Sequence, residues 1–162
     1  MPNRKKEAAI SDANILIDFV AVDEDLIQEM VRFWEKVYVP DVILYEVKDL
    51  SFYRAKALGL TVISTPIASL PMLPGLSFQD RTCLYFVKEN GWVCITNDKL
   101  LRKECVNFGA EVIWGLRMIL HLVENKQISK NRAREAATNI QTINPTISIK
   151  ILDNFLNILE RL

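Results

Sequence analysis

The sequence predicts an α/β fold with a mostly parallel central sheet and helices on both of its faces. Over the first 115 residues, short apolar runs typical of strands alternate with segments of helical spacing, which is the pattern of a parallel sheet. The residues that follow are helical in pattern throughout. A chain of 162 residues fits one domain, so we expect a core over residues 1–115 and C-terminal helices over residues 116–162 that pack on it or extend it.

The first part of the chain contains strand-like runs and helical patterns before an irregular region. The segments that we expect are a strand at 8–11, helices at 14–20 and 25–34, a strand at 37–39, helices at 41–48 and 54–59, and a strand at 60–64. Leu26, Met30 and Phe33 recur at helical spacing within the second of these helices. Pro40 is favoured at a helix start, and Asp41 suits the N-cap of the helix that follows.

The second part begins with prolines and a glycine between residues 66 and 77, which interrupt regular structure. The segments that we expect after them are a helix at 78–90, a strand at 92–96, a helix at 98–108, a strand at 111–114 and helices at 116–126, 130–141 and 147–162. Ser129 is placed to cap the penultimate helix. The last helix carries an apolar stripe, so it needs a surface to pack against.

Composition excludes several functional classes. The formal net charge is zero, which gives no support to a constitutively basic nucleic-acid-binding surface. The sequence has no run of about 20 apolar residues and no signal-peptide pattern, so we expect a cytoplasmic protein without a membrane span. Its three cysteines form no C-x-x-C pair and its one histidine is distant, which predicts free thiols and argues against zinc. The absence of a Gly-rich phosphate loop argues against P-loop and dinucleotide-binding functions.

Four carboxylates occupy positions that need an explanation. Asp12 and Asp98 each follow a predicted strand, and parallel sheets bind ligands at the carboxyl ends of their strands. Asp80 falls on the inward face of its helix, in line with apolar residues. Glu46 falls near the C-terminal end of its helix, where the dipole disfavours an anion, and it shares a face with apolar residues.

Three of these acids also have a purely structural interpretation. Asp12 and Asp98 can act as N-caps, and Asp80 lies near a helix N-terminus, where a negative charge is favoured. Glu46 fits neither role, because a buried carboxylate without a partner is costly or takes up a proton. A divalent cation would serve all four acids, and oxygen donors select a hard ion such as Mg²⁺ or Mn²⁺.

Four segments, in this order, resemble the PIN domain: ISDANILIDF, VPDVILYEV, LSFQDRTCLYFVKENG and ITNDKLLRKECVNFGAEVIWG. The resemblance spans residues 10–115 and implies a three-layer α/β/α sandwich. It also implies that an acidic quartet is catalytic and binds the metal, and that polar residues beside it support it. The quartet is Asp12, Glu46, Asp80 and Asp98, and the supporting residues are Asn14, Thr96 and Asn97. Asn97 is also a departure, because many relatives have another acid there.

Within that family, the chain is most similar to VapC-type toxins of bacterial toxin–antitoxin pairs. The resemblance implies an endoribonuclease that uses Mg²⁺ or Mn²⁺ to activate water and to stabilise the leaving oxygen of an RNA phosphodiester. It also implies a cognate antitoxin, which typically inserts a peptide into the acidic groove. The C-terminal helices go beyond the compact toxin pattern. Their apolar stripe could pack on the domain, form a homodimer or hold this partner.

Basic side chains near the acids are candidates for binding RNA. Those that flank Asp80 and Asp98 could hold phosphates: Arg81, Lys99, Arg102 and Lys103. Those in the irregular region could clamp a single strand through charge and stacking: Tyr53, Arg54 and Lys56. A solvated helix face is the alternative for each of them. His121 falls in an apolar helix, and we expect it to be packed or exposed rather than catalytic.

Other functions use similar features. A DNA or structure-specific nuclease would use the same acids, and a non-catalytic PIN scaffold would act as a binding module. The intact quartet argues against the scaffold. A receiver-like signalling domain needs paired acids after its first strand and a lysine after a late strand, whereas here Asp12 stands alone and Gly115 follows Trp114.

Overall fold

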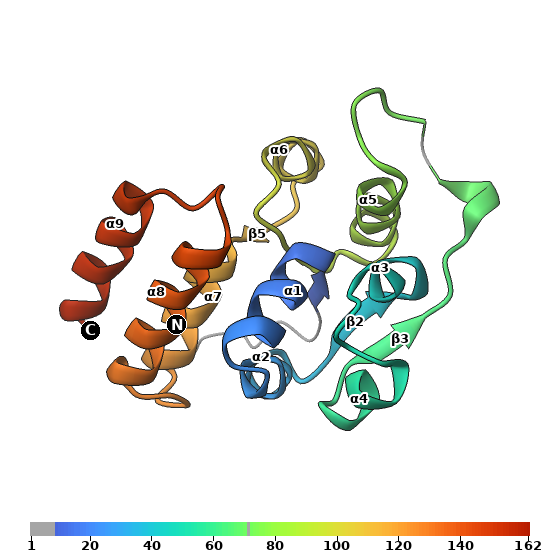
Figure 1. The fold of residues 1–162 in the computed structure, drawn as a ribbon. Coiled ribbons are helices and arrows are strands. Elements are labelled where there is room, and N and C mark those ends of the chain that lie inside the picture. Colours follow the sequence, from blue (N-terminus) through green and yellow to red (C-terminus); the bar gives the residue numbers. More distant parts are fainter. Residues whose placement is uncertain (1–8, 71) are drawn as a thin grey trace.

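The computed structural model describes residues 9–70 and 72–162, which form a layered α/β structure (Figure 1). In this part of the chain, five strands make one all-parallel sheet in the order β3-β2-β1-β4-β5. They are β1 (Ala9–Ser11), β2 (Val37–Pro40), β3 (Thr61–Ile63), β4 (Val93–Ile95) and β5 (Val112–Ile113). The predicted α/β class is therefore confirmed. Residue 8 of the first predicted strand, and most of the segment considered for a signal peptide, lie outside the described residues.

Helices cover both faces of the sheet. Those of the first part are α1 (Ala13–Val22), α2 (Asp25–Trp34), α3 (Asp41–Glu46) and α4 (Phe52–Ala57), followed by a short 3₁₀ helix, η1 (Ile67–Ser69). Those after it are α5 (Phe78–Asn90), α6 (Lys99–Asn107), α7 (Gly115–Glu124), α8 (Lys130–Ile143) and α9 (Ile149–Glu160). In Figure 1, α5 and α6 lie on one side of the sheet, and α2 and α4 lie on the other. This placement of helices on both faces of the sheet is the expected three-layer arrangement (Figure 1).

Serine and aspartate side chains begin many of the helices. Ser129 caps α8 as predicted, because its Oγ accepts from the Arg132 amide at 3.1 Å. Ser51 caps α4 in the same way, so that helix begins two residues before the predicted residue 54. The assignment of Asp41 as an N-cap was wrong. Pro40 takes that position, and Asp41 instead accepts a hydrogen bond from the Thr65 hydroxyl at 2.6 Å, which ties α3 to the segment after β3.

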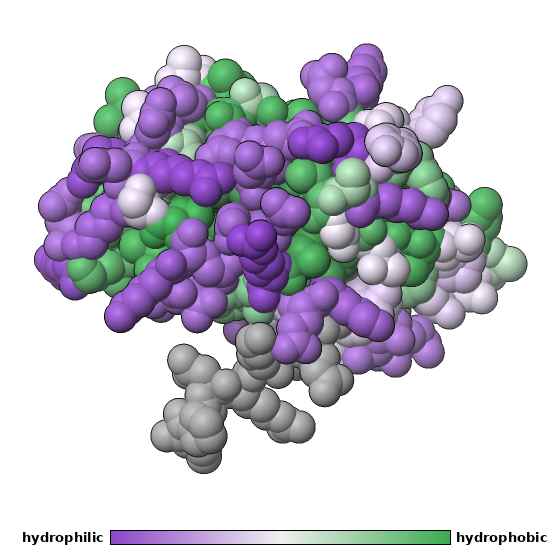
Figure 2. Space-filling view, turned by 90° about the horizontal axis from the view of Figure 1, so that it is seen from below, coloured by the Kyte–Doolittle hydropathy of each residue, from purple (hydrophilic) through white to green (hydrophobic). Residues whose placement is uncertain are grey.

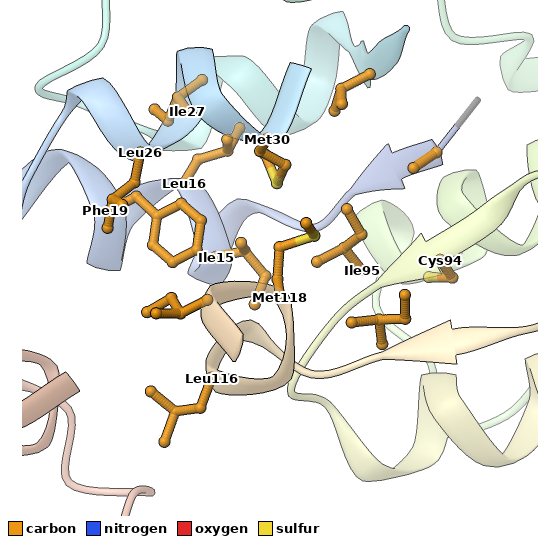
Figure 3. Close-up of a cluster of buried hydrophobic side chains, with 14 of the residues drawn as sticks. Ile15, Leu16, Phe19, Leu26, Ile27, Met30, Cys94, Ile95, Leu116 and Met118 are labelled. Atoms are coloured by element: carbon orange, nitrogen blue, oxygen red, sulfur yellow. The ribbon is translucent and has the colours of Figure 1, made fainter. Parts of the chain in front are cut away.

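The C-terminal helices pack on the helices of the first part. α8 contacts α1, α7 contacts α2, and α9 contacts α7 and α8. Figure 3 shows the core beneath α1, where Phe19 lies among side chains of α2, α7 and β4. The buried residues labelled there include Leu16, Met30, Ile95 and Met118. Burial on the order of 25 cal/mol per Å² of apolar surface makes such contacts the main stabilising term for these layers.

The surface has mixed character. Figure 2 shows one face of the molecule, on which hydrophilic side chains predominate and hydrophobic areas lie between them. Across residues 9–70 and 72–162, no helix has the length and apolar character that crossing a bilayer requires.

The order of the strands reverses between β1 and β4. From β1 the chain moves outward to β2 and β3, and it then returns to β4 and β5 on the other side of β1. Ser11 pairs with Ile95, so Asp12 and Thr96 leave the sheet side by side at its carboxyl edge. In open parallel sheets, such a switch point opens a crevice in which ligands bind.

Candidate active site

Asp12 and Thr96 form the buried centre of this edge. Asp12 is 6% exposed and Thr96 is fully buried. The Thr96 hydroxyl donates to Asp12 Oδ2 at 2.7 Å and accepts from the Asp98 amide at 3.0 Å, so it links the segments after β1 and β4. Asp12 is also the N-cap of α1, because its Oδ1 accepts from the Asn14 amide at 3.2 Å. The orientation of Asp12 is thus set by two neutral donors.

Asp98 is the N-cap of α6, as its structural interpretation predicted. Its Oδ1 accepts from the Leu101 amide at 2.7 Å. Within the described residues, its Oδ2 has no hydrogen bond, so one oxygen stays available to a ligand while the other holds the helix. A cap position and a binding position are therefore compatible for this side chain.

Asp80 and Glu46 approach the same edge from α5 and α3. Asp80 lies in the first turn of α5, whose N-cap Ser77 accepts from the Asp80 amide at 3.1 Å. Partial burial raises the pKa of Asp80 to about 6, and the negative charges of Asp12, Asp98 and Glu46 add to the rise. Like charges at close range thus add to the effect of burial on this carboxyl.

The prediction that Glu46 lies within a buried apolar stripe was wrong. Its side chain is exposed, and the buried residues of α3 are Ile43 and Leu44. The helix ends at Glu46, and the buried Val47 is its C-cap outside helical geometry, so helical spacing does not set the direction of the Glu46 side chain. The pKa of Glu46 is nevertheless raised, by partial desolvation and then by Asp12, which places it within electrostatic range of the buried acid.

The structure thus brings Asp80 within electrostatic range of the other three predicted acids. Burial raises the pKa of Asp12, and the charge of Asp98 raises it further. None of the four forms an ion pair with a cation among residues 9–70 and 72–162. In that same part of the chain, no three acidic, histidine or cysteine side chains converge closely enough to make a preformed metal site.

The donor set fits a hard divalent cation by its chemistry. It consists of carboxylate oxygens whose repulsion lacks a compensating charge, and Mg²⁺ or Mn²⁺ prefers such donors. Convergence of the side chains is opposed in the absence of a cation, because like charges repel and because the cap contacts draw Asp12 and Asp98 toward the backbone.

Asp18 is a buried acid outside the predicted quartet. It is 6% exposed, and its Oδ2 accepts from the Asn144 side-chain amide at 2.9 Å. Burial raises its pKa, the hydrogen bond from Asn144 lowers it, and Asp12 adds a smaller rise. The available signal was its position four residues after Asn14, which puts the two on one face of α1.

A groove of about 1000 Å³ opens beside Asp98 and reaches the predicted supporting residues Asn14 and Asn97. Asn97 Oδ1 accepts from the Gly115 amide at 3.0 Å, so this side chain anchors the start of α7. Lys99 and Arg102, two of the predicted RNA-binding residues, also line the groove.

The other basic candidates lie elsewhere. Arg54 lies on α4, where it forms an ion pair with Glu24, and it does not line the groove. Arg81 follows Asp80 on α5, but its guanidinium lies against the Phe78 ring and the Met72 sulfur. His121 is half-buried and stacks on a phenylalanine of α2, which agrees with a packing role.

The three cysteines are free, as predicted, and all three are buried. Cys94 lies on β4 and Cys105 on α6, and their thiols are hydrogen-bonded to each other. This hydrogen bond, and then burial, raise the pKa of Cys94, so its thiol stays protonated.

Comparisons with known proteins bear on the fold. No protein-family model matches this sequence, and no curated protein matches it. Among solved structures, it is similar to a PilT N-terminus domain protein from the hyperthermophilic archaeon Sulfolobus solfataricus P2. The TM-score is 0.55 at 13% sequence identity, over 70% of this chain and 92% of that one. At this identity the likeness concerns the fold, and it confirms that the chain has the PIN-like fold that its four sequence segments predict.

Proposed function

We propose that this chain is a nuclease dependent on Mg²⁺ or Mn²⁺, which cleaves RNA at the edge formed by Asp12, Glu46, Asp80 and Asp98. The observation that supports it most is the presence of four carboxylates near the switch point of the sheet, where Asp12, Glu46 and Asp98 each raise the pKa of another of the four. The fold-level likeness to a PilT N-terminus domain protein is consistent with a nuclease-type superfamily.

The four carboxylates would hold the cation, which when bound supplies positive charge to activate water and to stabilise the leaving oxygen. Thr96 keeps Asp12 oriented through its 2.7 Å hydrogen bond. Lys99 and Arg102 stand in the adjoining groove, where they can bind phosphates. In a chain with a single, half-buried histidine, these oxygen donors are the groups that suit phosphodiester hydrolysis.

The test is cleavage of a labelled single-stranded RNA with added Mn²⁺. We expect Asp12→Asn and Asp98→Asn each to reduce the rate at least about 100-fold, since even outer contacts of metal sites affect activity 10- to 100-fold. Asp153→Asn is the matched control, because this exposed residue of α9 lies outside the edge. Undiminished cleavage in both site variants, or cleavage that survives chelation of the metal, would sink the proposal.

RNA as substrate and a toxin role rest on the sequence resemblance alone. Cleavage of RNA and DNA oligonucleotides of one sequence separates a ribonuclease from a DNA or structure-specific nuclease. For the toxin role, we propose that the neighbouring gene encodes an antitoxin. This antitoxin should co-purify with the chain and inhibit cleavage. Failure of that protein to bind would remove the toxin role and leave the nuclease proposal intact.

A non-catalytic binding module is the second candidate. It is favoured by one observation, that the described acids do not converge into a preformed metal site. Stabilisation by Mn²⁺ distinguishes the two, because an ion that binds the folded state raises the melting temperature. A melting temperature that Mn²⁺ raises in the wild type but not in Asp80→Asn favours the nuclease.

A further inference from the structure

Besides Asn14 and Asp18 of α1, the groove beside Asp98 has three walls that come from distant parts of the chain. One wall is the start of α6, with Lys99 and Arg102, and a second is Trp114, which follows β5 directly. The third wall is the connection between α8 and α9, over residues 143–147. The groove is therefore continuous with the acidic edge, but half of its lining comes from the C-terminal region.

Trp114 and Arg102 form a platform within this groove. Trp114 is 41% exposed, and the Arg102 guanidinium lies 4.2 Å from the centre of its ring. Neither Lys99 nor Arg102 forms an ion pair with a carboxylate among the described residues. An exposed indole beside two uncompensated cations suits a ligand that combines a flat ring with a negative charge.

The third wall is held rigidly against α1. The Asn144 side chain donates to Asp18 at 2.9 Å, and its Oδ1 accepts from the Thr146 amide at 3.0 Å and from the Thr146 hydroxyl at 2.6 Å. Both ends of this amide are thus used to fix the turn after α8. A wall that is ordered before the ligand arrives reduces the entropy lost on binding.

We propose that this groove binds the single-stranded segment of the substrate next to the acidic edge, with one base stacked on Trp114 and the backbone held by Lys99 and Arg102. The proposal rests on the proposed nuclease function and identifies the substrate as unpaired nucleic acid. A duplex cannot use the platform, because its bases are stacked on one another and their faces are not available.

The test is binding of a fluorescently labelled oligonucleotide, measured by anisotropy with a chelator present so that the strand stays intact. We expect Trp114→Ala to weaken single-strand binding about 5- to 150-fold, and Trp114→Phe to retain most of it, because stacking on an aromatic ring is worth about 1–3 kcal/mol per base. Lys99→Ala should lower the slope of log affinity against log salt by about 0.7, the value for one phosphate contact on a single strand.

Phe108 provides the matched control. It is 51% exposed and lies 4.1 Å from the ammonium group of Lys88, so it repeats the cation–aromatic pair outside the groove. Phe108→Ala should leave binding unchanged. Equal losses in the two alanine variants, or tighter binding of a duplex than of the single strand, would overturn the proposal. Absence of oligonucleotide binding by the wild-type protein would also overturn the proposal, and it would favour a protein ligand for the groove.

The outcomes separate this proposal from the nuclease function. Metal-dependent cleavage, together with oligonucleotide binding that is unchanged in Trp114→Ala, would support the nuclease function and contradict the proposed role of the groove. Oligonucleotide binding that depends on Trp114, without cleavage in the presence of any metal, would support the proposed role of the groove and contradict the nuclease function.

Discussion

The carboxylates at the two ends of α1 have opposite electrostatic surroundings. At its C-terminal end, Asp23 receives two hydrogen bonds from the Arg132 guanidinium of α8, at 2.7 and 3.1 Å. At its N-terminal end, Asp12 is more deeply buried, and its donors among the described residues are neutral, so burial raises its pKa and the charge of Asp98 adds to the rise. Among the described residues, a cation pairs with the carboxylate that joins two helices, and none pairs with the four acids at the edge of the sheet. Uncompensated charge of this kind lowers the stability of the metal-free protein, and a bound cation would reverse the loss.

Asp80→Asn tests the acidic end most strongly. If the proposed function holds, cleavage should fall at least about 100-fold, as for the other site acids. The same change should stabilise the metal-free protein at pH 7.5 by about 1 kcal/mol, a figure reduced for the partial exposure of this side chain. The measurement is urea unfolding with a chelator present.

The stability effect of Asp80→Asn has a defined pH dependence. The pKa of Asp80 is about 6 in the folded state, against 3.8 for the free side chain. Between these values the folded state binds more protons, so the wild type loses stability as pH rises through this window. The gain from Asp80→Asn should therefore vanish near pH 4. An equal gain at both pH values would contradict the crowding of the acids.

Thr96→Val should have the next largest effect. It removes the hydroxyl that orients Asp12, and we expect cleavage to fall about 10- to 100-fold, the usual range for groups that hold metal ligands. Thr82→Val is the control, because this buried hydroxyl only bonds the Phe78 carbonyl of its own helix. Similar losses of activity in both variants would show that Thr96 acts only through packing.

Asn144→Ala tests the link between α1 and the C-terminal helices. It leaves Asp18 buried without its donor, and we expect a loss of about 1–3 kcal/mol in the free energy of unfolding. Asn139→Ala, at an exposed position of α8, should change stability little. If the two variants unfold alike, the Asp18 contact does not stabilise this interface.

Arg132→Ala tests the paired end of α1 and should have the smallest effect. Its ion pair with Asp23 is half-buried and bidentate, so we expect a loss of about 1 kcal/mol, near the upper end for such pairs. Arg134→Ala removes a more exposed pair with Glu160 and should change stability less. Both values should shrink at high salt, because salt screens exposed charges. A larger loss for Arg134→Ala would contradict the comparison.

The sequence predicted the strands and most helix boundaries because these depend on local patterns. Apolar runs of strand length and capping serines are properties of a few neighbouring residues, as for Ser129 before α8. The positions of Asp12 and Asp98 at strand ends followed from the same patterns. Glu46 was predicted less well, because its six-residue helix ends at it and helical spacing no longer decided its burial.

Tertiary structure alone decided which distant residues share an edge or a groove. Asp18 meets Asn144 across 126 residues, and neither position marks the other in the sequence. The platform of Arg102 and Trp114, and the pairing that holds Arg54 to Glu24, likewise depend on how helices pack. The sequence by itself therefore determined a parallel α/β sheet with acids at its carboxyl edge. Packing decided which of those acids are buried and which side chains line the groove beside them, because contacts between elements depend on their arrangement in space rather than on local propensity.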